Sequence, residues 1–163
     1  MIHILEGTVF IDNVNEFLHN LKKIGIKKNI VIQAMDADKL AGEEHVRFAV
    51  EKAINSFKTG ANIANDLSKE ILLYAAGTRQ IAKAVKLGIH KGQNNVALVA
   101  VGDAPDLSGF VEIEPAHVLA YNDSKKEAIM KIFGITNEEI EAVGEDKIPE
   151  LVIERVALQD VLK

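Results

Sequence analysis

The sequence predicts an α+β protein, with a central mixed β-sheet packed with helices and three consecutive helices at the C-terminus. Strand-like and helix-like segments are interspersed through the first two thirds of the chain, and the last third is helical. This order favours α+β over a doubly wound parallel sheet. The 163 residues are 48% hydrophobic, which is enough for one domain, residues 1–163, with its own core.

The first half carries clear element signals. A strand is predicted at 2–11, rich in Ile, Val and Phe, and a second at 29–34. Between them, Asn13 with Glu16 resembles a capping box that starts a helix, and Gly25 is expected to end it. A helix is also predicted over about 43–58, where apolar residues recur at helical spacing before Thr59-Gly60.

The second half contains one ambiguous segment. Residues 67–76 begin like a helical turn, but the apolar run ILLY before Gly77 favours a buried strand. The remaining predictions are a helix from Thr78 to Leu87, a strand at 96–101, an edge strand within 109–120 at Pro115, a helix from Ser124 to Gly134, a helix from Thr136 to Gly144 and a last helix from Ile148.

The composition excludes several classes of protein. There is no cysteine, which excludes a disulfide framework, a zinc ribbon and a cysteine nucleophile. The first residues, MIHILEGTVF, lack the basic flank of a signal peptide, and no apolar run approaches the length of a membrane span. We therefore expect a soluble, cytoplasmic protein.

No motif of a nucleotide enzyme or metalloenzyme is present. The chain lacks G-x-x-x-x-G-K-[ST], G-x-G-x-x-G and H-E-x-x-H, and its five histidines are widely separated. Asp36 and Asp38 follow a strand, where catalytic carboxylates often lie, although use in a turn or cap explains them more simply. We expect no catalytic residue, no metal and no cofactor.

The net charge of −5 hides an uneven distribution. Residues 19–91 carry thirteen bases and seven acids, a net +6, whereas residues 1–18 carry −3 and residues 92–163 carry −8. A basic middle segment indicates a polyanionic partner. Lysines on the solvated face of helices explain it equally well.

A candidate phosphate site lies within the basic segment. Gly77, Thr78, Arg79 and Gln80 lie at the start of the predicted helix, with Thr78 as its expected N-cap, so that free backbone N–H groups and an arginine would face an anion. Lys83 lies on the same helix, and Lys58, Asn62 and Asn65 come from the preceding segment; amide side chains can contact base edges.

The last helix has apolar residues on two sides. Its broader arc, expected to face the core, comprises Ile148, Leu151, Val152, Val156, Leu158 and Leu162. A second stripe of Ile153, Ala157 and Val161 lies on the opposite side. Either the helix is enclosed on both sides within its own domain, or the second stripe is a docking face for a partner protein.

Several segments in combination resemble a known family. AGEEHVRFAVEKAINSF, SKEILLYAAGTRQIAKAVKLGI, NNVALVAVG and ELVIERVALQDV are similar to the archaeal branch of the small regulatory subunit of the KEOPS complex, the relative of the PRPK-binding protein TPRKB. The resemblance covers essentially the whole chain and is densest from 40 to 102.

The resemblance implies a non-catalytic subunit in the synthesis of threonylcarbamoyladenosine (t6A) on tRNA. It implies that the chain binds and stimulates a small atypical kinase/ATPase subunit, contacts other KEOPS subunits indirectly, and helps recruit tRNA through its 3′ CCA end. By the same resemblance, the RNA-binding residues are Gly77, Thr78, Arg79, Gln80, Lys83, Lys58 and Asn62.

Two alternatives remain at this stage. Besides the tRNA-binding subunit, the chain could be a regulator of the kinase that makes no contact with RNA, for which Ile153, Ala157 and Val161 form the protein interface. The other alternative is a small α/β enzyme with a site assembled from scattered residues.

Overall fold

The computed structural model describes residues 1–107 and 112–162, and within helix α7 it leaves out the side chain of Leu162. The chain divides into two compact units, which we describe separately. The single domain expected from chain length stays a prediction. No helix among the described residues is long and apolar enough to cross a membrane.

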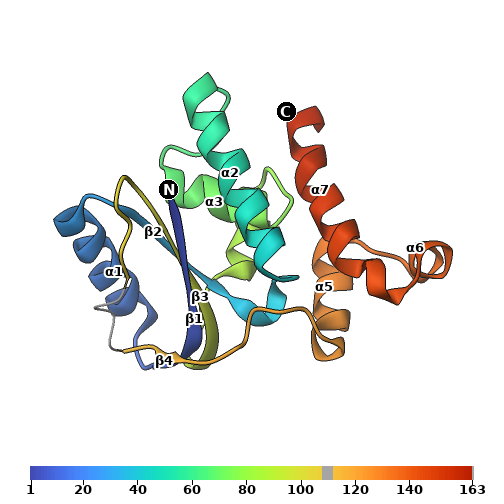
Figure 1. The fold of residues 1–163 in the computed structure, drawn as a ribbon, viewed down its shortest axis with the longest axis horizontal. Coiled ribbons are helices and arrows are strands. Elements are labelled where there is room, and N and C mark those ends of the chain that lie inside the picture. The colour runs from blue at the N-terminus through green and yellow to red at the C-terminus, as the bar shows by residue number, and fades with distance from the viewer. Residues whose placement is uncertain (108–111, 163) are drawn as a thin grey trace. The chain divides into compact units, whose positions relative to one another are not determined.

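Unit 1 comprises Met1–Ala37 and Gly88–Leu119 and is built around a four-stranded sheet (Figure 1). The strand order is β2-β3-β1-β4, and each neighbouring pair is antiparallel, so the sheet is not the mixed sheet that we expected. The elements are β1 (Ile2–Ile11), α1 (Val14–Lys28), β2 (Val31–Asp36), β3 (Gly92–Val101) and β4 (Glu114–Pro115).

Helix α1 begins as predicted but does not end at Gly25. The side chain of Asn13 accepts a hydrogen bond from the backbone N–H of Glu16 at 3.0 Å. The helix continues to Lys28, and its C-cap residue, Asn29, adopts a left-handed φ of 55°. Gly25 is needed for close approach, because a Cβ there would lie 2.8 Å from the carbonyl oxygen of Ile30.

The core of unit 1 lies between the sheet and α1. Side chains of one sheet face alternate along each strand and pack against Phe17 and Leu21 of α1. The buried residues of this core are Val9, Ile11, Phe17, Leu21, Ile30, Ala34, Val96, Leu98, Ala100, Leu107 and Ile113.

The predicted edge strand within 109–120 is present only as β4, and residues 109–111 lie outside the described residues. Pro115 pairs with Gly7 of β1 at the edge of the sheet, where a residue without an N–H is tolerated. A Cβ on Gly7 would lie 2.3 Å from the carbonyl oxygen of Glu114, so the pairing requires glycine there.

Unit 2 comprises Asp38–Leu87 and Ala120–Lys163 and is helical in its described residues. Helix α2 packs against α3 and α7 (Figure 1). The helices are α2 (Glu43–Thr59), α3 (Leu67–Ala75), α4 (Ile81–Ala84), α5 (Lys126–Phe133), α6 (Asn137–Val143) and α7 (Ile148–Leu162), with 3₁₀ turns at Ala37–Lys39, Val85–Leu87, Asp123–Lys125 and Glu145–Lys147. The α+β class and the three C-terminal helices are confirmed.

The preference for a strand at 67–76 was wrong. These residues form α3, capped by Asp66, whose carboxylate accepts a hydrogen bond from the N–H of Lys69 at 2.9 Å. Residues 70–76 are all buried. A helix enclosed on every side is apolar on every side, so the 3.6-residue periodicity that distinguishes helix from strand is absent.

The caps of the C-terminal helices follow the predictions in part. Thr136 and Glu139 form the predicted capping box, and Gly134 ends α5 with a φ of 63°. Ser124 does not cap α5. A 3₁₀ turn comes first, and the side chain of Asn122 accepts the N–H of Ser124 at 3.0 Å.

His45, near the start of α2, makes hydrogen bonds to the segment before α2 and to the end of α3. Its Nδ1 accepts the N–H of Ala41 at 3.0 Å, and its Nε2–H donates to the carbonyl of Ala75, at the end of α3, at 2.8 Å. Burial lowers the pKa of His45 from 6.5 to about 4, with a smaller lowering by the charge of Lys125 opposed by the bond to Ala75. The imidazole is therefore neutral in the fold.

We predict that His45 makes stability fall in acid. Because its pKa is lower in the folded state, the unfolded chain binds one more proton between pH 6.5 and 4. The contribution of His45 to the free energy of unfolding is fully present above pH 6.5. It decreases by up to about 3 kcal/mol as the pH falls through 4. Urea unfolding across this range should show wild type losing stability relative to His45→Gln, an uncharged variant that can make both hydrogen bonds. Parallel profiles would contradict the prediction.

Candidate functional site

The segment from Gly77 to Gln80 is a tight turn between two helices of unit 2. Gly77 has a φ of 62°, and the N–H of Thr78 donates to the carbonyl of Leu73 at 3.1 Å, which closes the end of α3. The positive φ favours glycine at this position.

The predicted helix from Thr78 to Leu87 is mostly absent. Helix α4 has four residues and is followed by a 3₁₀ turn, and Thr78 is not its N-cap. Instead, Oγ1 of Thr78 accepts the N–H of Gln80 at 3.1 Å within the turn. Because a helix dipole sums over aligned peptide units, such a short helix provides no phosphate site of the predicted kind.

The predicted RNA-contacting residues all belong to unit 2, and all are at least partly exposed. Arg79, Gln80 and Lys83 are exposed, and Gly77 and Thr78 are partly exposed. Lys58, at the end of α2, and Asn62 are exposed on the preceding segment. The loop 61–65 and the turn 77–80 are adjacent, because Ile63 from the loop and Thr78 from the turn line the same small hollow, together with Glu70, Leu73, Tyr74 and Gln159.

Glu70 orders the loop 61–65, and sequence analysis did not identify it. Its side chain is fully buried, and its carboxylate accepts the N–H groups of Ile63 and Ala64 at 3.1 and 2.8 Å. The hydroxyl of Ser56 donates to the same carboxylate at 2.7 Å. A glutamate inside the apolar sequence LSKEILLYA is the signal that could have indicated a buried acceptor.

The charge around this turn is positive. Residues 58–86 contain five bases and two acids, of which Glu70 is buried and Asp66 is exposed, and both accept backbone hydrogen bonds. Asp66 caps α3, and Glu70 binds the loop amides. The cations Lys58, Arg79 and Lys83 are exposed and lie on the segments that flank or form the turn.

A polar network beside the hollow connects α2, α3 and α7. The hydroxyl of Tyr74 donates to Asp160 at 2.6 Å, and Lys52 donates to the same carboxylate at 2.8 Å. Burial, then the hydrogen bond and charge of Asp160, raise the pKa of Tyr74 well above its usual value. Tyr74 therefore stays a neutral donor and fixes the position of α7 relative to α3.

The second apolar stripe of α7 is accessible in unit 2. Ile153 and Ala157 are partly exposed, and the side chain of Val161 is 76% exposed. Of the arc expected to face the core, Leu158 is 44% exposed, contrary to the expectation, and Leu162 lies outside the described side chains. Ile148, Leu151, Val152 and Val156 are buried as predicted.

Arg155 anchors α7 on the side opposite the stripe. Its guanidinium donates to the carbonyls of Phe133 and Gly134 at 3.1 and 3.2 Å, and to Glu139 at 2.6 Å. The bond from Arg155 lowers the pKa of Glu139. These contacts connect α7 to the end of α5 and to α6.

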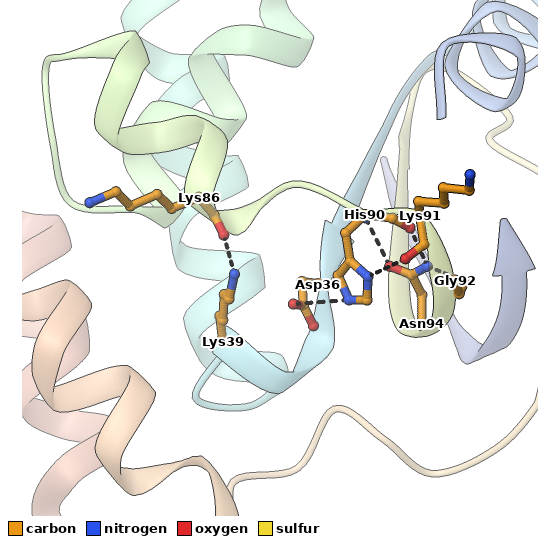
Figure 2. Close-up of polar contacts among 7 residues, drawn as sticks. All are labelled: Asp36, Lys39, Lys86, His90, Lys91, Gly92 and Asn94. Carbon is orange, nitrogen blue, oxygen red and sulfur yellow. Dashed lines mark hydrogen bonds and ion pairs between the residues drawn. The ribbon is translucent and has the colours of Figure 1, made fainter. Parts of the chain in front are cut away.

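The strand-end carboxylate Asp36 lies beside a histidine of unit 1 (Figure 2). Nε2 of His90 is 3.9 Å from Asp36, while Nδ1 of His90 is 3.0 Å from the carbonyl oxygen of Lys91. The amide of Asn94 donates to the carbonyl oxygens of His90 and Gly92, which fixes this turn. These contacts belong to a structural turn.

Figure 2 also shows a hydrogen bond within unit 2, between Lys39 and Lys86. Nζ of Lys39 donates to the carbonyl oxygen of Lys86 at 2.7 Å, at the end of the segment that follows the 77–80 turn. Within residues 1–107 and 112–162, no group of three or more histidine, aspartate or glutamate side chains could hold a metal ion.

The family model and the relatives that match this chain carry the same name, Cgi121. A family model described as kinase binding protein CGI-121 matches residues 10–160. The chain is 32% identical over 155 residues to the regulatory protein Cgi121 of Methanocaldococcus jannaschii, covering 92% of each protein. It is 43% identical over 61 residues to the KEOPS complex subunit Cgi121 of Pyrococcus abyssi, or 37% of this chain and 36% of that protein. The resemblance read from the sequence is therefore confirmed, and the chain belongs to the CGI-121 family.

Proposed function

We propose that this chain is a non-catalytic, cytoplasmic KEOPS subunit in t6A synthesis. In this role it binds and stimulates the small atypical kinase/ATPase subunit and helps recruit tRNA through its 3′ CCA end. Support comes from the family description, which names a kinase-binding protein, and from relatives named as a regulatory protein and as a KEOPS subunit.

The observation that carries the RNA part of the proposal is the basic surface of unit 2. Lys58, Arg79 and Lys83 are exposed in unit 2, as are Asn62 and Gln80, and the two acids of residues 58–86 both accept backbone hydrogen bonds. Lysines can follow the backbone of a single-stranded end, while amides and a guanidinium contact its bases. In this proposal the exposed guanidinium of Arg79, with aliphatic side chains, supplies the base contacts.

The second candidate function is kinase regulation without any contact to RNA. The exposed stripe of Ile153, Ala157 and Val161 favours it, because an apolar face on a helix end is suited to a protein partner. The two candidates agree on the kinase and differ only in whether the chain binds tRNA.

We predict that removing the 3′ CCA end from tRNA distinguishes the two candidate functions. The purified chain should bind intact tRNA at least about tenfold more tightly than tRNA lacking its 3′ CCA, since each stacked or contacted base adds to the affinity. Fluorescence anisotropy over a salt series should give a slope of about −0.7 per phosphate neutralised on a single strand. Equal affinity for the two RNAs would exclude recognition of the 3′ end.

We predict that Arg79→Ala weakens tRNA binding several-fold and reduces the salt slope by about 0.7, because one phosphate contact is lost. Lys131→Ala is the matched control, since it removes one exposed cation from α5. Equal effects of the two substitutions would show that only net charge matters and would remove Arg79 from the site.

We predict that Ile153→Arg weakens association with the kinase subunit by at least about tenfold, because a charge would be buried in an apolar interface. Calorimetry with the purified kinase measures the affinity, and thermal unfolding reports whether the variant folds. Ile26→Arg on α1, where the side chain is 73% exposed, is the control. A folded Ile153→Arg variant with wild-type affinity would move the docking face elsewhere.

A further inference from the structure

The loop between α2 and α3 has no regular structure, yet it is fixed at several points. Gly60 ends α2 with a φ of 73°, and the N–H of Ala61 donates to the carbonyl of Ser56 at 2.9 Å. The amide of Asn62 donates to the carbonyl of Ala64 at 2.9 Å. These contacts are local and partly exposed, so they alone do not determine where the loop lies relative to α3.

Glu70 supplies the contact that fixes the loop to α3. Its Oε1 accepts the N–H of Ala64 at 2.8 Å and that of Ile63 at 3.1 Å, and its Oε2 accepts the hydroxyl of Ser56 at 2.7 Å. The side chain is 0% exposed. Hydrogen bonds to a buried carboxylate are roughly twice as strong as neutral ones, and breaking them leaves buried polar groups without partners.

The fixed loop lies beside the turn that carries Arg79. Ile63 follows Asn62 directly and lines one hollow with Thr78 and Glu70. A loop already ordered in the free protein does not lose conformational entropy when it binds a ligand, which raises affinity. The contacts of Glu70 with Ile63 and Ala64 therefore hold the residues that follow Asn62 against α3 before any RNA binds.

We propose that Glu70 is a positioning residue for the RNA surface of unit 2, acting through the loop 61–65 and touching no RNA itself. The inference rests on the proposed tRNA binding. The direction of the change in RNA affinity separates a positioning role from a purely electrostatic effect. Deleting a carboxylate below a basic surface strengthens attraction to RNA by Coulomb's law, whereas deleting a residue that orders the loop weakens binding.

Two substitutions at Glu70 separate charge from position. Glu70→Ala removes the charge and the acceptors. Glu70→Gln removes only the charge, because its carbonyl can accept from the loop N–H groups and its NH₂ can donate to Ser56, whose hydroxyl then donates to the carbonyl of Ala53, at 3.0 Å. Glu51→Ala, which removes an exposed carboxylate of α2, is the charge control.

The expected results have opposite directions. Affinity for intact tRNA should fall about tenfold in Glu70→Ala and be restored in Glu70→Gln, while Glu51→Ala binds like wild type. In the Glu70→Ala background, Asn62→Ala should cost little further affinity, because the loop is already displaced. A folded Glu70→Ala variant with wild-type affinity, or an equal loss in Glu70→Gln, would overturn the positioning role.

Hydrogen exchange tests the loop contact without RNA. The N–H groups of Ile63 and Ala64 should exchange at least about tenfold faster in Glu70→Ala than in Glu70→Gln, with amides in the middle of α2 unchanged. Faster exchange throughout α2 would indicate unfolding and would overturn the local role. If wild type bound no tRNA, the proposed function and the positioning role would both fall, while this exchange difference would still establish the contact between Glu70 and the loop.

Discussion

A carboxylate placed inside an apolar helix bundle must find hydrogen-bond donors, and this requirement determines the surroundings of Glu70. The donors come from the loop 61–65 and from Ser56 of α2, so satisfying one charge joins α2, the loop and α3. His45 makes a second connection, from the start of α2 to the end of α3. These two buried polar side chains therefore connect α2, the loop 61–65 and α3.

The same bundle exposes two different surfaces. The turn after α3 and the end of α2 carry cations and amides, including Lys58, Arg79 and Gln80, whereas α7 exposes the apolar stripe ending at Val161. Lys52, Tyr74 and Asp160 connect the helices that bear these surfaces. A subunit that contacts both a kinase and a nucleic acid needs two such surfaces, which is consistent with the proposed function.

The elements that could be predicted are those whose signal is local. Two helices were identified in this way, one from Thr136 with Glu139 and one from the apolar spacing of 43–58. Caps and amphipathic faces depend only on residues close together in the sequence. The errors arose where burial was complete or where a glycine serves close packing instead of ending a helix. Residues 67–76 lost their periodicity inside the bundle, and Gly25 contacts Ile30 instead of ending a helix.

The sequence by itself determined the α+β class, the family, the basic middle segment and the candidate residues around Arg79. The class and the basic segment follow from composition and local periodicity, whereas the family and the RNA role of the candidate residues follow from the resemblance of several segments to a known family; neither needs knowledge of distant contacts. Only the tertiary structure decided that Thr78 lies in a turn instead of capping a long helix, that Val161 is exposed, and that Glu70 orders the loop 61–65. Burial and hydrogen-bond partners depend on which segments pack together, and a linear pattern does not specify that.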